Sequence, residues 1–491
     1  MNVQTTDSSL LEMTVSQSPA VRVPTYQTVH LVGIAGSGMK ALAEYLADSG
    51  WSISGSEQSE ESSASWSLRE LGICIHPGHS EKHLSAECDI LIHSSAIGPD
   101  NPERLAAEKL GIPQFSLSEF LGQMMRDRIG LSIAGTHGKS TTSALLAWIF
   151  EHAGLKPSAI VGAEFCDADH QKRSHRNGWA GDGAYLIVES CEFRRNFLNL
   201  SPQHAVILGI EPDHFDCFMN VEESVAAYAK FASQLPVNGS LLLNGDCPHS
   251  ETLRKVCMAN VETYSLTPGA DWWATDFRFL RGGTRFRVFH REDFLTEICL
   301  PLPGRHNIQN ALAAVAMSFS QGISANTIRE AICEFPGIRR RYERTGYWRG
   351  VRMIDDYAHH PTAVASTLQT VRQEFPNRRI LCAFQPHQVL RTQQLMSEFS
   401  TAFQDADEVM IVPVYTAREG ADSPAKDVSI GLARQIQTAG TSCRFLPSLD
   451  HLTTTLEDEA RPGDVVVTMG AGDIDRVQHE FTRRVQRNHA A

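Results

Sequence analysis

Residues 131–154 read LSIAGTHGKSTTSALLAWIFEHAG, and this stretch decides which fold the rest of the chain has to fit. The apolar run at 131–134 is typical of a buried strand, and the run after residue 141 is typical of a helix that ends at Gly154. The glycine-rich loop between them lets the backbone approach an anion, at which the N–H groups of the first helical turn point. The stretch therefore predicts an α/β domain with a phosphate site.

The loop itself consists of Gly135, Thr136, His137, Gly138, Lys139, Ser140 and Thr141. Lys139 supplies a positive charge, and the hydroxyl that follows it can reach a Mg²⁺ ion. Ile133 occupies the position at which the full phosphate-loop pattern has its first glycine. A strand-to-helix turn that binds no ligand is therefore the alternative interpretation.

The chain on either side repeats the same alternation of short apolar strands and helices. Upstream, a βαβ pattern covers 28–57, and a second pass covers 72–97. Downstream, apolar runs alternate with helical segments up to about residue 334, which is typical of a parallel sheet. Alternating residues around a Gly-Gly turn predict a β-hairpin at 275–292.

A third series of strand-like runs begins after the basic segment FPGIRRRYER at 335–344. We expect three α/β domains, because 491 residues exceed what one core of about 150 residues accommodates. The expected domains are 26–127, 128–335 and 336–491, after a disordered tail at 1–25 that is rich in Ser, Thr and Gln.

Charge and composition exclude several classes of protein. A formal net charge of -13 argues against a nucleic-acid partner, which would need a broad basic surface. The 11 cysteines are odd in number and form no C-x-x-C pair, which is typical of reduced thiols rather than of a disulfide or zinc framework. Neither an export signal nor an apolar stretch of about 18 residues is present, so we expect a cytoplasmic protein without a membrane span.

A second glycine loop lies near the start of the first domain. Gly33, Gly36 and Gly38 follow a strand-like run and precede a helical one, so we expect a diphosphate site at that helix N-terminus. Their spacing is G-x-x-G-x-G rather than G-x-G-x-x-G. Glu57, after the next strand, could take a ribose hydroxyl. A plain tight turn and a nicotinamide-dependent oxidoreductase are the alternatives.

Two polar residues of the central domain follow neighbouring strands. Glu189 ends the run AYLIVES, and His214 lies after the next run, so both are expected at the carboxyl edge of the sheet. A carboxylate and an imidazole there could hold Mg²⁺ against nucleotide oxygens. An ordinary surface carboxylate and a packed histidine are the alternative.

Two further groups of polar residues suit the recognition of ligands. Asn307 and Asn310 open a helix one turn apart, after His306, and their amides could read a purine edge or only cap the helix. In the third domain, several histidines and Arg391 gather where two strands end. Such a group suits a substrate carboxylate or phosphate, although the histidines could instead be structural caps.

Taken together, these motifs resemble the Mur ligases in order and spacing from about residue 26 to residue 475. The resemblance implies a Rossmann-like N-terminal domain that binds a UDP-sugar, a central P-loop-type ATPase domain with a mostly parallel sheet, and a Rossmann-like C-terminal domain that receives an amino acid. The motifs that carry it are GIAGSGM at 33–39, GTHGKSTT at 135–142, Glu189 with DHFD at 213–216, GRHNIQNALAA at 304–314, DDYAHHP at 355–361 and FQPH at 384–387 with Arg391 and Thr392.

Within the family, GIAGSGM, SGSE at 54–57, SSAI at 94–97 and the FQPH motif are most similar to the members that join L-alanine to UDP-N-acetylmuramate. The implied reaction is phosphorylation of the muramate carboxylate by ATP, followed by attack of the amine on the acyl phosphate. ATP and Mg²⁺ are the implied cofactors, peptidoglycan precursor synthesis is the implied role, and a monomer or weak homodimer is the implied assembly. A recycling ligase that attaches a tripeptide and a non-catalytic nucleotide-binding regulator are the alternatives.

The resemblance also implies roles for the residues that match the family's motifs. The expected catalytic residues are Lys139, His359 and Arg391, and the expected metal ligands are Ser140, Glu189 and His214. The other expected contacts are, for ATP, Gly135, Thr136, His137, Gly138, Lys139, Ser140, Thr141, His306, Asn307, Asn310 and Arg340; for the UDP-substrate, Gly33, Gly36, Ser37, Gly38, Met39, Ser56, Ser94, Ser95 and His137; and for the amino acid, Tyr357, His359, His387 and Arg391.

Some positions depart from the family's pattern or extend it. Gln388 stands where an arginine is usual, so one partner for the amino-acid carboxylate has lost its charge. The run VESCEFRR carries Arg194 and Arg195 where the family has part of an acidic stretch, which can rearrange the contacts around a metal. Some members carbamylate a lysine after the DH motif, and Lys230 lies at about the matching distance.

Overall fold

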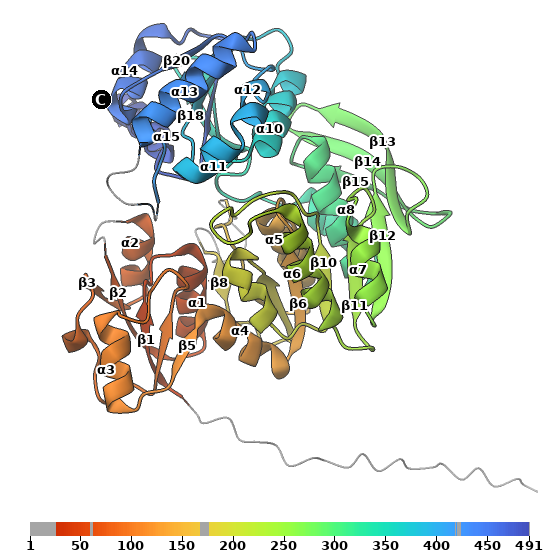
Figure 1. The fold of residues 1–491 in the computed structure, drawn as a ribbon. Helices are drawn as coiled ribbons and strands as arrows, with labels where there is room; N and C mark the ends of the chain where they lie inside the picture. Colours follow the sequence, from red (N-terminus) through yellow and green to blue (C-terminus); the bar gives the residue numbers. More distant parts are fainter. Residues whose placement is uncertain (1–25, 59–61, 167–175, 418, 420–423, 491) are drawn as a thin grey trace, which may run out of the picture.

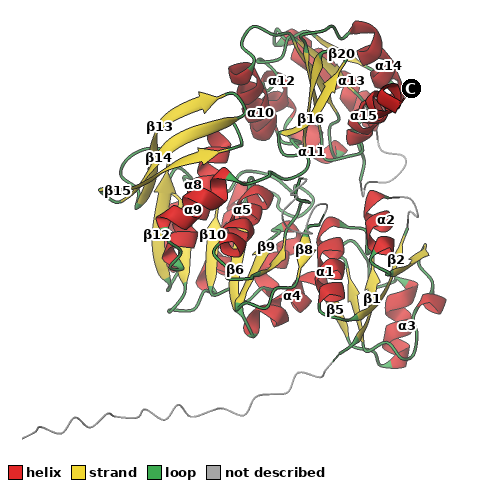
Figure 2. Cartoon of the chain, turned by 180° about the vertical axis from the view of Figure 1, so that it is seen from behind, coloured by secondary structure: helices red, strands yellow, loops and turns green. Residues whose placement is uncertain are grey.

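A computed structural model of the chain describes residues 26–490 apart from 59–61, 167–175, 418 and 420–423. The tail expected at 1–25 lies outside the described residues. Three α/β units follow one another along the chain, each built on its own sheet (Figure 1). Seen from behind, the strands of each unit lie side by side with helices packed around them (Figure 2). The fold class predicted from the sequence is confirmed.

The N-terminal unit is a fully parallel sheet in the order β3-β2-β1-β4-β5. Parallel neighbours need crossover connections, and most of the intervening segments are helices. The order reverses beside β1, and ligands of open α/β sheets bind in the crevice at such a point. The elements are β1 (Thr28–Val32), α1 (Ser37–Asp48), β2 (Ser52–Glu57), α2 (Ser63–Glu70), β3 (Cys74–Pro77), η1 (Glu81–His83), β4 (Ile90–His93), α3 (Pro102–Leu110), β5 (Gln114–Ser116) and α4 (Leu117–Arg126).

The central unit is a sheet in the order β15-β14-β13-β12-β11-β10-β6-β9-β7-β8. Its middle is parallel and includes the pairing of β12 with β13, whereas the β7-β8, β13-β14 and β14-β15 pairs at its two edges are antiparallel. The hairpin expected at 275–292 is confirmed, because Leu280 pairs with Gly283 across the turn. The elements are β6 (Ile129–Ala134), α5 (Lys139–His152), β7 (Ser158–Ile160), β8 (Gly178–Trp179), β9 (Tyr185–Glu189), η2 (Phe193–Asn199), β10 (His204–Ile207), α6 (Val221–Ser233), β11 (Ser240–Asn244), α7 (Ser250–Val256), β12 (Asn260–Ser265), β13 (Trp272–Leu280), β14 (Gly283–His290), β15 (Asp293–Leu300), α8 (Arg305–Ser320) and α9 (Ala325–Cys333).

The C-terminal unit is a sheet in the order β16-β17-β21-β18-β19-β20, parallel except for the β16-β17 pair. Among the described helices, none combines the length and the apolar composition that crossing a membrane requires. The elements are β16 (Glu343–Trp348), β17 (Val351–Asp356), α10 (Pro361–Glu374), β18 (Ile380–Phe384), α11 (Val389–Gln394), α12 (Met396–Thr401), β19 (Glu408–Ile411), α13 (Ala425–Thr438), β20 (Cys443–Phe445), α14 (Leu449–Glu459), β21 (Val465–Met469) and α15 (Asp475–Ala490).

The apolar core is continuous between the first two units and separate in the third. One cluster unites Leu31 and Leu42 of the N-terminal unit with Ile160 and Leu186 of the central sheet. A second cluster fills the space between the central sheet and α5, α8 and α9. The C-terminal unit has clusters of its own, against which Phe215 of the central unit packs. The first two units therefore share a core, whereas the third docks from outside it.

Candidate active site

A large cleft lies between the three units and has a volume of about 2090 Å³. Pockets for one drug-sized ligand measure about 300–1,000 Å³, so this cleft has room for more than one substrate. The cleft brings together residues of all three units that the sequence singles out for ligands: Ser37, Ser94 and Ser95, then Ser140 and Glu189, then Arg340 and Tyr357.

Three helices begin at a glycine and start without a side-chain cap. The N-cap residues of α1, α5 and α8 are Gly36, Gly138 and Gly304, and none of these three caps makes a side-chain hydrogen bond. In contrast, α2, α3, α4, α6, α9 and α14 are each capped by a Ser or Asn side chain. Unpartnered N–H groups at a helix start attract anions, so these three helices are suited to hold phosphate groups.

Gly138 and Lys139 fix the geometry of the central glycine loop. Gly138 has φ +81°, and a Cβ atom there would lie 2.2 Å from Asn310 Oδ1, so only glycine fits. Lys139 Nζ donates to the carbonyl oxygen of Gly135 at 2.6 Å and to Glu192 Oε2 at 3.0 Å. Burial acts to lower the pKa of Lys139, but Glu192, together with Cys191 and Glu189, outweighs it and the pKa is raised. Lys139 is therefore charged, and Glu192 balances that charge.

Ser140 and Glu189, two of the expected metal ligands, lie in contact with each other. Ser140 Oγ donates to Glu189 Oε1 at 3.1 Å, and Glu189 Oε2 accepts the backbone N–H of Gly162 at 2.6 Å. A hydroxyl and a carboxylate are oxygen ligands of the kind that Mg²⁺ prefers. The donor set therefore fits this ion beside the phosphate loop.

His214, the third expected ligand, belongs to a second group with Cys191 and Glu192, in which the ligand atoms lie within 4.8 Å of one another. His214 Nε2 is 3.7 Å from Glu192 Oε1. The backbone of His214 has φ 53°, a left-handed conformation that costs energy in residues other than glycine and is common at functional positions. The expected metal ligands thus form two sets, which the Lys139–Glu192 pair connects, rather than one.

The residues expected near the adenine lie at the start of α8. Asn307 Nδ2 donates to the carbonyl oxygen of Pro303 at 2.7 Å, so this amide supports the turn before the helix without capping it. Asn310 lies against Gly138 of the phosphate loop. Burial lowers the pKa of His306 to about 4, which leaves a neutral ring at physiological pH.

The first glycine loop connects the N-terminal unit to the central unit. Ser37 Oγ donates to the carbonyl oxygen of Gly162 at 2.6 Å. The N–H of Gly162 also donates to Glu189. Gly162 therefore contacts both Ser37 of the first glycine loop and the carboxylate beside the phosphate loop. Glu57 Oε2 accepts the backbone N–H of Ala35 at 3.0 Å, so this carboxylate helps to close the loop.

Two residues expected to touch the UDP-substrate have buried side chains. Ser56 is fully buried, and its hydroxyl donates to Glu103 Oε2 at 2.6 Å. Met39 is 1% exposed and belongs to the core that the first two units share. Ser56 therefore supports the loop from behind, whereas Met39, although its side chain is almost fully buried, is among the residues that line the cleft. Ser94 and Ser95 do line the cleft.

The four residues expected around the amino acid come together. The ring centroids of Tyr357 and His359 lie 5.2 Å apart, and those of His359 and His387 lie 5.8 Å apart. Arg391 Nη1 donates to His387 Nδ1 at 3.1 Å. His359 Nδ1 lies 2.8 Å from its partner, the carbonyl oxygen of Tyr357, so Nδ1 carries the proton and Nε2 the lone pair. Burial lowers the pKa of His359 well below its usual value and keeps the ring neutral.

The charge of Arg391 is already paired. Its Nε donates to Asp213 Oδ1 at 2.7 Å, and both side chains are buried. Burial alone would raise the pKa of Asp213, but Arg391 holds it well below its usual range, so the carboxylate is ionised. Gln388 lies beside this pair with φ 66° at the start of α11 and adds no charge. The pocket therefore offers an amino-acid carboxylate less positive charge than its arginine suggests.

Arg340 and Lys230, two further residues singled out from the sequence, have different surroundings. Arg340 lines the cleft, but its Nη2 and Nη1 donate to the carbonyl oxygens of Gly470 and Gly472 at 2.7 and 3.0 Å. Its Nε lies 3.3 Å from Asp355, so the guanidinium is held within the C-terminal unit. Lys230 is exposed on α6 and is not among the residues that line the cleft. Neither side chain is presented to a phosphate group in this arrangement.

Three acids of the site were missed by sequence reasoning. Asp213 pairs with Arg391, Glu192 balances Lys139, and Glu211 Oε2 accepts the hydroxyl of Thr362 at 2.7 Å. Spacing did not distinguish them from neighbouring acids. The signal that could have found two of them is the run IEPDHFD, which places three acids directly after a strand of the sheet.

Comparisons with known proteins identify the family. Sequence profiles match the chain at 28–129 (Mur ligase family, catalytic domain), 133–318 (Mur ligase middle domain) and 340–472 (Mur ligase, glutamate ligase domain). A UDP-N-acetylmuramate–L-alanine ligase from Salinibacter ruber is 36% identical over 461 residues, which is 93% of this chain and 95% of the relative.

Solved structures agree with this similarity. The UDP-N-acetylmuramate-alanine ligase from Thermotoga maritima superposes with a TM-score of 0.79 at 27% identity, covering 94% of this chain and 99% of that one. A murein peptide ligase from Psychrobacter arcticus shares the fold, with a TM-score of 0.72 at 23% identity, covering 93% and 98%. Consecutive family matches over all three units, together with similarity over nearly the full length, show that the chain belongs to the Mur ligase family.

Proposed function

We propose that the chain joins L-alanine to the carboxylate of UDP-N-acetylmuramate, with ATP converted to ADP and phosphate. The observation that carries the proposal is the cleft, which is lined by the first glycine loop, by Ser140 and Glu189 beside the phosphate loop, and by Tyr357 of the amino-acid pocket. The names of the Salinibacter ruber and Thermotoga maritima relatives support the same reaction. We place it in peptidoglycan precursor synthesis in the cytoplasm, where ATP and UDP-sugars are available.

The first step activates the carboxylate, because a free carboxylate does not readily expel an oxide group. An oxygen of the muramate carboxylate attacks the γ-phosphorus of ATP, the bond from that phosphorus to the bridging oxygen breaks, and ADP leaves with the electron pair. Lys139 would turn from Glu192 to the γ-phosphate and stabilise its charge. Mg²⁺, when held by Ser140 and Glu189, would neutralise further negative charge.

The second step forms the amide. The amine of L-alanine attacks the acyl carbon, and the phosphate leaves with the electron pair of the carbon–oxygen bond. His359 is neutral and has its lone pair on Nε2, so it can accept a proton from the amine. Arg391 and Tyr357 would hold the amino acid, and Asp213 would have to share Arg391 with the substrate carboxylate.

The family matches to ligases over all three units disfavour a nicotinamide oxidoreductase. Glu57 accepts the N–H of Ala35 and so closes the first glycine loop. Gln388 adds no charge to the amino-acid pocket, so the assay compares L-alanine directly with a tripeptide.

The proposal is tested by incubating the protein with ATP, UDP-N-acetylmuramate and either one of a panel of radiolabelled amino acids or the tripeptide. We expect labelled UDP-product and stoichiometric ADP with L-alanine. Turnover with the tripeptide but not with L-alanine would overturn the L-alanine assignment. We further expect Lys139→Ala to abolish ligation and to leave the affinity for UDP-N-acetylmuramate nearly unchanged. Undiminished ligation by that variant would remove Lys139 from the phosphate role.

A further inference from the structure

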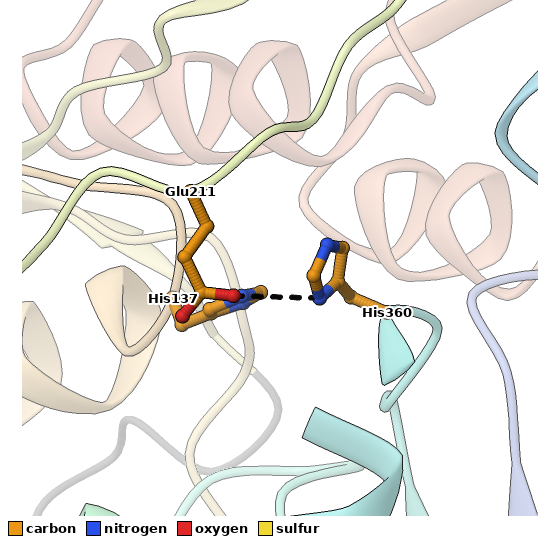
Figure 3. A group of neighbouring side chains, drawn as sticks. All are labelled: His137, Glu211 and His360. Atoms are coloured by element: carbon orange, nitrogen blue, oxygen red, sulfur yellow. Dashed lines mark ion pairs between the residues drawn. The ribbon is translucent and has the colours of Figure 1, made fainter. Parts of the chain in front are cut away.

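Two histidines and a carboxylate lie together where the central unit meets the C-terminal unit (Figure 3). His137 comes from the phosphate loop, Glu211 from the loop that follows β10, and His360 from the residue before α10. His137 Nε2 lies 3.4 Å from Glu211 Oε2, and His360 Nδ1 lies 3.8 Å from the same oxygen. The three ligand atoms all lie within 4.8 Å of one another. The proposed reaction gives no role to Glu211 or His360.

The hydrogen bonds of His360 show which of its ring nitrogens carries the lone pair. His360 Nε2 lies 3.2 Å from the carbonyl oxygen of Pro212, so Nε2 carries the proton and donates it. Nδ1 therefore holds the lone pair, on the side of the ring that faces Glu211 (Figure 3). Nδ1 also caps α10 by accepting the backbone N–H of Thr362 in a long hydrogen bond of 3.4 Å, which a bound metal would displace. A histidine that binds a metal usually donates its other N–H to a carbonyl or carboxylate in this way.

His137 and Glu211 are also positioned to bind a metal ion. His137 Nε2 is buried and has no hydrogen-bond partner of acceptable geometry among the described residues. A buried polar atom without a partner is uncommon, because it loses the hydrogen bond that it would make to water. Glu211 Oε2 accepts the hydroxyl of Thr362 at 2.7 Å, which orients the carboxylate.

The donor set and its spacing favour a transition metal over Mg²⁺. In a tetrahedral zinc site with bonds of about 2.0–2.1 Å, the ligand atoms lie about 3.3 Å apart, and two of the distances here are 3.4 and 3.8 Å. Mg²⁺ prefers oxygen ligands in an octahedron, whereas two imidazoles and one carboxylate are a common zinc set. We propose that His137, Glu211 and His360 form a binding site for Zn²⁺ or a similar transition metal, with one coordination position open.

Such an ion would connect two units. His137 and Glu211 belong to the central unit and His360 to the C-terminal unit, so a bound metal holds the C-terminal unit in the position seen in Figure 1. It would slow any opening that product release requires and thereby inhibit ligation. This inhibition rests on the proposed function, whereas metal binding does not, so the two can fail separately.

Cobalt titration of the full-length protein tests the site. Protein treated with a chelator and returned to excess Mg²⁺ is titrated with Co²⁺ alone, followed by visible absorption and equilibrium dialysis. We expect one Co²⁺ per chain, with the intense visible bands of four- or five-coordinate cobalt and without the near-ultraviolet band of a cobalt–thiolate bond. Zn²⁺ should displace the cobalt. The absence of saturable Co²⁺ binding overturns the proposal.

Variants assign the ion to these residues. Glu211→Gln and His137→Gln should each weaken Co²⁺ binding at least about 100-fold, and Thr362→Val about 10-fold through the loss of its bond to Glu211. Cys191→Ser removes a ligand from the other candidate group and should leave the affinity unchanged. Circular dichroism and a metal-free melting curve check that each variant is folded. Unchanged binding in both Glu211→Gln and His137→Gln, or a thiolate band that disappears in Cys191→Ser, would refute the assignment.

Discussion

The N-terminal and C-terminal units meet the central unit in two different ways. On the N-terminal side the two units share one apolar core, and β8 touches α1 so closely that a Cβ atom on Gly178 would lie 1.8 Å from the carbonyl oxygen of Ala41. On the C-terminal side the contact is largely polar and includes Arg391 with Asp213, and Thr362 with Glu211. The N-terminal interface therefore resembles the interior of a domain, whereas the C-terminal interface resembles an interface between two separate proteins.

The difference teaches which parts of the site can move. Separating the first two units would expose apolar surface at a cost of about 25 cal/mol for each Å². A polar contact contributes a net of only about 0.5–1.5 kcal/mol, because water replaces it when it breaks. We therefore expect the first glycine loop and the phosphate loop to stay fixed relative to each other, while the amino-acid pocket approaches and leaves with the C-terminal unit.

The largest expected effect comes from the buried charges of the N-terminal interface. Lys40 is 3% exposed, and its Nζ lies 2.5 Å from Glu44 Oε1 and 3.1 Å from Asn177 Oδ1. Lys40→Met leaves the Glu44 charge buried without this partner, so we expect a loss of about 3–5 kcal/mol in chemical denaturation. The matched control is Lys255→Met, because Lys255 makes an exposed pair with Glu251 at 3.9 Å and should change stability by less than about 0.5 kcal/mol. Equal losses in the two variants would contradict a tightly packed N-terminal interface.

The outer units should respond to pH in opposite directions. Burial alone would raise the pKa of Glu103, but hydrogen bonds from His30 and Ser56 hold it at about 2, so its stabilisation is present above pH 4.5 and is lost as the pH falls towards 2. Burial raises the pKa of Asp355 from 3.8 to about 7, so its stabilisation is present below pH 3.8 and is lost as the pH rises through 7. Each contribution is on the order of 3 kcal/mol, because one pKa unit corresponds to about 1.4 kcal/mol.

Hydrogen exchange measured across this pH range resolves the two units. Glu103→Gln should reduce the loss of stability that the N-terminal unit shows as the pH falls towards 2. Asp355→Asn should reduce the loss of stability that the C-terminal unit shows as the pH rises through 7. If either substitution instead changed the pH response of both outer units equally, the C-terminal unit would not be energetically separate from the other two.

A smaller effect is expected from the close backbone approach at β8. Gly178→Ala puts a methyl group against the Ala41 carbonyl and should cost about 1–3 kcal/mol in unfolding free energy. Gly431 lies in α13 with open space around its Cα, so Gly431→Ala should be neutral or stabilise by up to about 1 kcal/mol. A Gly178→Ala protein as stable as the Gly431→Ala protein would show that β8 and α1 can separate without penalty.

The smallest effect is expected at the polar interface. Thr362→Val removes the hydroxyl that binds Glu211 and should favour opening of the C-terminal unit by about 0.5–1.5 kcal/mol, while global stability stays nearly the same. X-ray scattering should then show a larger radius of gyration. Thr438→Val, which removes a hydroxyl bonded within its own helix, is the control and should leave the scattering profile unchanged. Identical profiles for both variants would argue that this contact does not restrain the C-terminal unit.

The sequence predicts well the structural elements that are determined by a few neighbouring residues. The apolar run and the glycines at 131–154 predicted β6, the phosphate loop and α5, because strand burial, loop geometry and helix length are all set within a few residues. The Gly-Gly turn predicted the β13-β14 hairpin for the same reason. The order of strands in each unit then brought Ser95, Ser140 and Tyr357 to one cleft.

Contacts between residues that are far apart in the sequence could not be predicted in this way. Arg391 and Asp213 are 178 residues apart in sequence, and only the docking of one unit on another brings them together. Ser56 lies in the expected strand, but the pattern does not show that its hydroxyl turns inward to Glu103. His214 was placed on the correct edge of the sheet, yet its grouping with Glu192 depends on how the loop after β10 folds back.

The glycines at the starts of α1, α5 and α8 have a consequence for the lifetime of the protein in a cell. Without a capping side chain, the first N–H groups of these helices depend on water until an anionic ligand arrives. A helix cap contributes about 0.5–2 kcal/mol, so each substrate that binds completes a helix as well as filling the cleft. Proteases should consequently degrade the loaded protein more slowly than the empty one, and starvation for nucleotides would shorten its survival.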